Sequence, residues 1–268
     1  MSLSSFNAPG ILFDTAHKGQ KTTVLIVKAI LAGFAGIDVS AQSEYYREDL
    51  VGEALDFLKR DWNYWRDDLF VQTKFDLEAE DPALAEQTIE QRIRYSLEKS
   101  TQHLGGPPDS YLLAQELKTP EETLSALLVL KQLVQEGKIL SKIGIRTIYS
   151  KHRIDWLLSH GAQIDIIQSP FGSSNFQGSA LKTIWETSMD LDAVFSRSDP
   201  ILSLAKAKVM TPKQAMYGVC TWMGVTPLCD VADEPSIKAA IRMTDISSWT
   251  LADVQPVIDS FREETCRL

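Results

Sequence analysis

Charged side chains recur where short apolar runs of this sequence end. A polar residue at such a place often only marks the point where the chain leaves the core. Five of eight run ends are charged, however, and carboxylates and cations gathered at one place could bind a small polar molecule and move protons. The eight positions are Asp14, Asp38, Lys74, Ala114, Arg146, Gln168, Asp192 and the segment after Leu228.

The apolar runs alternate with longer amphipathic stretches along the whole chain. Strands that alternate with helices of roughly 10–20 residues are typical of βαβ units with parallel strands. The predicted strands are 11–15, 34–39, 69–74, 110–113, 139–145, 164–168, 191–195 and 225–228. The predicted helices are 21–32, 48–60, 83–102, 121–136, 151–160, 178–187, 212–223 and 234–242.

Eight such units in 268 residues predict an α/β fold, a closed (β/α)8 TIM barrel with short loops. A doubly wound open sheet is the alternative, but no predicted strand is followed by a GxGxxG or GxxxxGK[ST] phosphate loop. Because no low-complexity stretch divides the chain, residues 1–268 are expected to form one domain. In such a barrel the C-terminal strand ends carry the active site, so the charged run ends are expected to meet.

Composition argues against several functional classes. The chain has 27 basic and 36 acidic residues and a net charge of −9, which argues against nucleic-acid and membrane partners. The first ten residues lack the basic start and apolar run of a signal peptide, so a cytoplasmic location is expected. Three cysteines and four scattered histidines have no metal-site spacing, and no metal is expected.

An ordered set of motifs resembles the aldo-keto reductase family in its fungal style. The resemblance implies the barrel expected above and an activity of NADPH-dependent carbonyl reduction. Its motifs are GID at 36–38, YREDLVGEAL at 46–55, DLFVQTK at 68–74, DSYLL at 109–113, LVQEGK at 133–138, IGI at 143–145, IQ at 167–168 and VTPLC at 225–229.

The resemblance also implies catalytic roles. In the family a Tyr donates a proton, a Lys lowers the pKa of that Tyr, and an Asp holds the Lys; Tyr46, Lys74 and Asp38 match these places. The logic is sound because a phenol with a pKa near 10 is a poor acid at pH 7 until a neighbouring cation shifts it. Tyr45 leaves a one-residue ambiguity, and we favour Tyr46 because it directly precedes the Arg-Glu-Asp run.

Other places of the family pattern carry different residue types. Ala114 replaces the family's histidine, and the stretch 228–234, where the family holds the 2′-phosphate with cations, contains three carboxylates that would repel it. The loop after the seventh strand is expected to be shorter than in the family. The nicotinamide site is therefore expected to be vacated, and its predicted lining is Asp14, Arg146, Thr147, Gln168 and Asp192, of which only Gln168 matches the family.

These departures favour an enzyme on this barrel that has no cofactor. Proton transfer would then support dehydration, isomerisation or cyclisation of a small natural-product-like molecule. An NADPH-dependent carbonyl reductase is the alternative, and a non-catalytic binding relative is a further one. The predicted substrate contacts are His17, Tyr45, Phe75, Ala114, Arg146 and Phe171.

The expected partner is a small-molecule substrate. The sequence stops soon after its last predicted helix, at Leu268, which predicts either an open pocket or one that a second copy closes in a homodimer.

Overall fold

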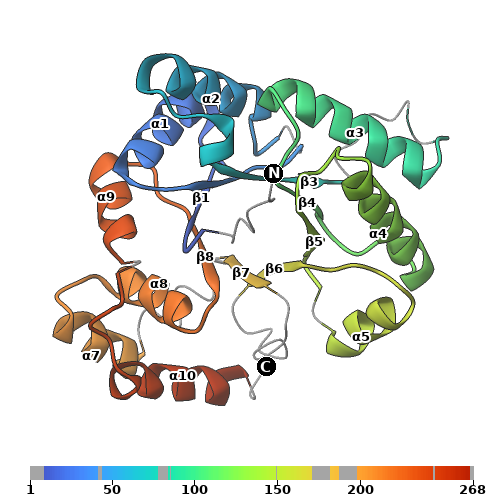
Figure 1. Ribbon diagram of the computed structural model, residues 1–268. Helices are drawn as coiled ribbons and strands as arrows, with labels where there is room; N and C mark the ends of the chain where they lie inside the picture. The colour runs from blue at the N-terminus through green and yellow to red at the C-terminus, as the bar shows by residue number, and fades with distance from the viewer. Residues whose placement is uncertain are drawn as a thin grey trace.

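The computed structural model is a closed barrel of parallel strands, with helices arranged around the outside (Figure 1). The strands follow the chain order around the barrel, and β8 closes it by pairing with β1. The predicted (β/α)8 barrel is thereby confirmed. The strands are β1 (Leu12–Asp14), β2 (Gly36–Asp38), β3 (Phe70–Phe75), β4 (Ser110–Leu113), β5 (Lys142–Arg146), β6 (Ile166–Pro170), β7 (Lys182–Glu186) and β8 (Thr226–Cys229).

The helices largely follow the predicted stretches, with α7 and α10 in addition. Two of them begin as their sequence predicts, because Thr119 and Thr211 each accept a backbone N–H of the first turn and a proline follows. The helices are α1 (Thr22–Ala32), α2 (Glu48–Trp62), α3 (Ile89–Leu104), α4 (Pro120–Gln135), α5 (Lys151–Ser159), α7 (Asp199–Ala207), α8 (Pro212–Trp222), α9 (Glu234–Arg242) and α10 (Leu251–Thr265), with 3-10 turns η1 (Gly19–Lys21) and η2 (Arg66–Asp68).

The structure describes residues 9–41, 44–77, 84, 86–148, 150–170, 182–186, 198–243 and 245–265, although not the side chains of 170, 182–186 and 261–265. None of the helices in these ranges is long and apolar enough to cross a membrane.

The seventh strand differs from its prediction. The sequence pattern predicted a helix over 178–187 and a strand over 191–195, whereas β7 occupies 182–186 and pairs with β6 and β8. The segment KTIWE is rich in β-branched and aromatic residues, which favour a strand, and it is short for a helix. Asp192 consequently does not end the seventh strand, and it lies outside the described residues.

Strand alternation separates the barrel interior from the helix layer. An apolar cluster takes one residue from each of five strands and fills the interior: Leu12, Phe70, Leu112, Ile166 and Leu228. Two residues further along β1 and β3, the register places Asp14 beside Asp38 and Asp38 beside Gln72. A polar layer therefore lies above the apolar one, toward the C-terminal mouth of the barrel.

Gly144 shows how tightly this interior is packed. A Cβ atom at Gly144 would lie 1.9 Å from the carbonyl oxygen of Ile166 on the neighbouring strand. We predict that Gly144→Ala destabilises the barrel by about 1–3 kcal/mol, the usual cost of overpacking, as measured by urea denaturation. Gly106→Ala is the matched control, because no atom lies within 4 Å of a Cβ there. Equal stability of the two variants would contradict the packing described.

Candidate functional site

Lys74 and Asp38 form an enclosed ion pair at the carboxyl ends of β3 and β2. The Lys74 Nζ donates to both Asp38 carboxylate oxygens at 2.6 Å and to the carbonyl oxygen of Val39 at 3.0 Å. The two side chains are 1% and 0% exposed. Because each N–H of the ammonium has an acceptor, the group is held in place and acts on its surroundings as a charge.

Tyr46 is the phenol that the fold brings to this ammonium. The Lys74 Nζ lies 5.6 Å from the centroid of the Tyr46 ring, and the half-buried ring packs against the main core. Tyr45 is exposed and lies against His17, with ring centroids 4.8 Å apart. Of the two tyrosines left open by the sequence, Tyr46 is thus the one beside Lys74.

His17 and Tyr45 form a separate pair at the mouth. The His17 N–H donates to the carbonyl oxygen of Tyr45 at 2.8 Å, which ties the loop after β1 to the loop after β2. Both side chains are exposed. Their predicted contact with substrate stays a prediction, but the structure does bring the two residues together.

Asp14 adds a second carboxyl group to the polar layer. Burial and the negative charge of Asp38 raise the pKa of Asp14 to about 7, although the N–H of Ala16 and the charge of Lys74 oppose this. A carboxyl group with such a pKa can give or accept a proton at neutral pH. Two carboxylates at neighbouring strand ends place Asp14 in the site from the sequence, but nothing in the sequence indicates its raised pKa.

The barrel interior also engages Gln168. This fully buried side chain accepts a hydrogen bond from Gln72 Nε2 at 2.7 Å, and the same Nε2 donates to Asp38 Oδ1 at 2.7 Å. Arg146 is half-buried at the end of β5 and in register with Gln168. Thr147 follows with a left-handed backbone (φ 57°) and donates its N–H to the Gln168 carbonyl oxygen at 2.9 Å.

Phe75 is the last residue of β3, and the direction of its side chain argues against the predicted contact with substrate. Successive strand residues face opposite sides, and because Lys74 faces the interior, Phe75 faces the helices and lies in the buried cluster with residues of α3 and α4. Ala114 follows β4, is buried and donates its N–H to the Phe75 carbonyl oxygen at 2.8 Å. Phe171 lies outside the described residues.

The acidic stretch after β8 is compensated locally rather than bare. Asp233 caps α9, because its Oδ1 accepts the Ser236 N–H at 2.9 Å, and this bond lowers the pKa of Asp233. Glu234 pairs with Lys238 at 2.7 Å and Lys28 at 3.0 Å, which lowers the pKa of Glu234 to about 2.

Asp230 is engaged in the same way. It forms an ion pair with Lys18, whose side chain is only 4% exposed. The sequence led us to expect that these three carboxylates would simply repel a phosphate. In the structure they instead pair with Lys18, Lys28 and Lys238 or accept a helix N–H.

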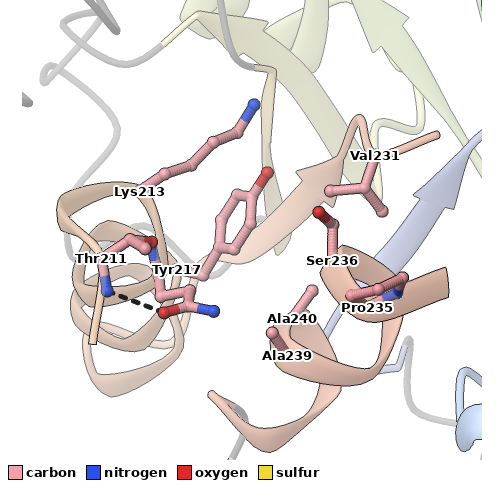
Figure 2. Close-up of a pocket in the computed structure, with 9 residues that line it drawn as sticks. Thr211, Lys213, Tyr217, Val231, Pro235, Ser236, Ala239 and Ala240 are labelled. Atoms are coloured by element: carbon pink, nitrogen blue, oxygen red, sulfur yellow. Dashed lines mark hydrogen bonds between the residues drawn. The ribbon is translucent and has the colours of Figure 1, made fainter. Parts of the chain in front are cut away.

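A cavity of about 290 Å³ lies between α8 and α9 (Figure 2). Lys213 and Tyr217 extend from α8, Ser236 lies on α9, and Val231 precedes α9. The remaining lining consists of Thr211, Gln214, Pro235, Ala239 and Ala240. Among the described residues, no group of three or more His, Cys, Asp or Glu side chains could hold a metal ion.

Comparisons with known proteins agree with the barrel fold. The model of the Aldo/keto reductase family matches residues 13–176, a stretch that contains Asp38, Tyr46 and Lys74 and ends before β7. No protein with curated function matches the sequence.

Solved structures share the fold at low sequence identity. An aldo/keto reductase from Brucella melitensis superposes with a TM-score of 0.76 and 17% identity over 93% of each chain. An aldose reductase from Schistosoma japonicum gives 0.77 and 16%, over 94% of this chain and 88% of that one. A Bombyx mori aldo-keto reductase in complex with NADP gives 0.78 and 17%, over 95% and 89%.

The titration of Asp14 predicts how stability depends on pH. Folded Asp14 keeps its proton up to about pH 7, whereas an ordinary aspartate has a pKa of 3.8. The stabilising contribution of the proton is therefore fully present below pH 3.8 and is lost as the pH rises through about 7. Asp14→Asn cannot ionise but retains an oxygen for the Ala16 N–H. Its free energy of unfolding, relative to the wild type, should rise across this pH range.

Urea denaturation at a series of pH values measures that difference. A pH-independent difference between Asp14→Asn and the wild type would contradict the raised pKa of Asp14.

Proposed function

The chain belongs to the aldo/keto reductase family, and from this premise we propose that it is an enzyme in which Asp38, Lys74 and Tyr46 transfer a proton to or from an oxygen of a small molecule. The observation that carries the proposal is the enclosed Lys74 ammonium, held by Asp38 and 5.6 Å from the Tyr46 ring. A cation near a phenol stabilises the phenolate and so makes the phenol a better proton donor.

Asp14 supplies the second proton-transfer group of this proposal. Its carboxylate removes a proton from the carbon next to a carbonyl group, while the Tyr46 hydroxyl protonates the carbonyl oxygen. One C–H bond breaks, one O–H bond forms on the substrate, and the product is an enol; no electrons enter or leave. Two groups with different pKa values suit this division of labour. Isomerisation, dehydration and ring closure of a small natural-product-like ketone all use such a step.

The charges that follow β8 argue against binding of NADPH, which the family uses. Its phosphates need cations or the N–H groups of a helix N-terminus. Asp233 caps the N-terminus of α9, and Asp230 holds Lys18. Glu234 forms ion pairs with Lys28 and Lys238. Inside the barrel, the Gln168 amide oxygen is engaged by Gln72. The proposed proton transfer therefore includes no step that involves nicotinamide.

NADPH-dependent carbonyl reduction is the second candidate. Family membership favours it, as does the similarity of fold to the Bombyx mori protein in complex with NADP. Lys213, a cation, also lines the cavity between α8 and α9. We rank it below cofactor-free proton transfer because the acidic residues after β8 engage Lys18, Lys28 and the start of α9.

Hydrogen–deuterium exchange tests the proton-transfer proposal without any cofactor. Simple ketones such as cyclohexanone are incubated with the protein in deuterium oxide, and ¹H NMR follows loss of the hydrogens next to the carbonyl. We predict protein-catalysed exchange that Tyr46→Phe lowers about 10²–10⁴-fold, the usual contribution of general acid–base catalysis. Tyr45→Phe is the matched control, one residue away, and should exchange at the wild-type rate.

Two results would oppose the proposal. One is a wild-type exchange rate equal to that of the double variant Asp38→Asn/Lys74→Met, which lacks the ion pair. The other is an equal loss of rate in Tyr45→Phe and Tyr46→Phe, since that would separate activity from the phenol beside Lys74.

A further inference from the structure

We infer that Glu48 is a positioning residue, which holds Tyr46 and Lys74 at their working distance by tying the start of α2 to β3. The inference rests on the proposed function, because the distance matters only if Lys74 acts on Tyr46. Glu48 is the first residue of α2, two positions after Tyr46, and it binds Thr73, the residue before Lys74.

The Glu48 carboxylate joins three elements from a buried position. Its Oε1 accepts the Thr73 hydroxyl on β3 at 2.5 Å, and its Oε2 accepts the Ser100 hydroxyl on α3 at 3.0 Å. His103 Nδ1, also on α3, lies 3.4 Å from Oε2, and this carboxylate raises the pKa of His103. The Glu48 side chain itself is 5% exposed.

Strand alternation makes the bond to Thr73 informative about Lys74. The two residues are consecutive on β3, so Thr73 faces the helix layer while Lys74 faces the barrel interior. A bond that fixes the outer side of β3 at Thr73 also fixes the point from which the Lys74 side chain begins. The same carboxylate fixes the start of α2, directly after Tyr46.

The helix that carries Glu48 has little freedom to move. At Gly52, one turn along α2, a Cβ would lie 1.8 Å from the carbonyl oxygen of His103. Contact this close sets α2 against α3, and Ser100 adds a second link between them. The bond between Glu48 and Thr73 links this packed pair of helices to β3 directly before Lys74.

Burial of a carboxylate is a costly way to join three elements. Apolar side chains could pack the same space without taking a charge out of water. A carboxylate instead fixes the direction and length of each bond that it accepts. Such geometric control is what a phenol and an ammonium in different elements require.

An NMR titration tests the inference directly. The protein is labelled with ¹³C at the tyrosine ring carbon that bears the hydroxyl, and Tyr46→Phe assigns the Tyr46 signal. The reference is Asp38→Asn/Lys74→Met, which removes the ion pair as a unit. Thr73→Val removes the hydroxyl that Glu48 accepts, Thr73→Ser retains it, and Ser100→Ala breaks only the link to α3.

We expect the Tyr46 signal to titrate at higher pH in the reference variant than in the wild type. Thr73→Val should shift the titration toward the reference, whereas Thr73→Ser and Ser100→Ala should match the wild type. A purely structural role for Glu48 would not separate Thr73→Val from Ser100→Ala. Circular dichroism verifies folding, and Glu48→Ala compared with Glu48→Gln replaces the Thr73 pair if Thr73→Val does not fold, with Gln expected to restore the wild-type titration.

Opposing outcomes distinguish this inference from the proposed function. If the wild type and the reference variant titrate alike, Lys74 does not act on Tyr46 and both fail. If those two differ but Thr73→Val titrates with the wild type, or if Ser100→Ala shifts equally, only the role of Glu48 is overturned.

Discussion

The enclosed ion pair of Lys74 and Asp38 governs the arrangement of the barrel mouth. An ammonium and a carboxylate that are nearly inaccessible to water are tolerated only when they are paired and hydrogen-bonded. β2 and β3 must therefore meet in the register that brings the two side chains together, and Gln72 must occupy the position from which it reaches Asp38 and Gln168. The polar layer above the apolar interior follows from satisfying one buried pair of charges.

The charges of the polar layer also influence the protonation of Asp14. Burial and the negative charge of Asp38 raise the pKa of Asp14 in the same layer to about 7, although the charge of Lys74 opposes this. The mouth thus contains a fixed cation beside a phenol and a carboxyl group that titrates near neutrality. Next to β1, the carboxylates that follow β8 engage Lys18, Lys28 and the start of α9. These acidic residues thereby pair with cations of neighbouring segments and cap a helix.

Much of this could be predicted from the sequence. Seven of the eight strands begin and end within three residues of their predicted bounds. The reason is that alternation of short apolar runs with amphipathic helices is a local signal. β7 was missed because a five-residue strand beside undistinguished neighbours carries little periodicity. The direction of the Phe75 side chain could not be predicted, because it is opposite to that of Lys74 on the same strand and the sequence does not show which side Lys74 faces. Lys18, which pairs with Asp230, and Lys28, which pairs with Glu234, come from the loop before α1 and from α1, and no local pattern reveals these two contacts.

We propose that this member of a reductase family transfers protons at Tyr46 without a nicotinamide cofactor. Titration of the protein with NADPH, followed by calorimetry and by quenching of tryptophan fluorescence, tests it most directly. We predict no saturable binding at millimolar NADPH. Binding in the low micromolar range would contradict the claim and would make carbonyl reduction the function of this barrel.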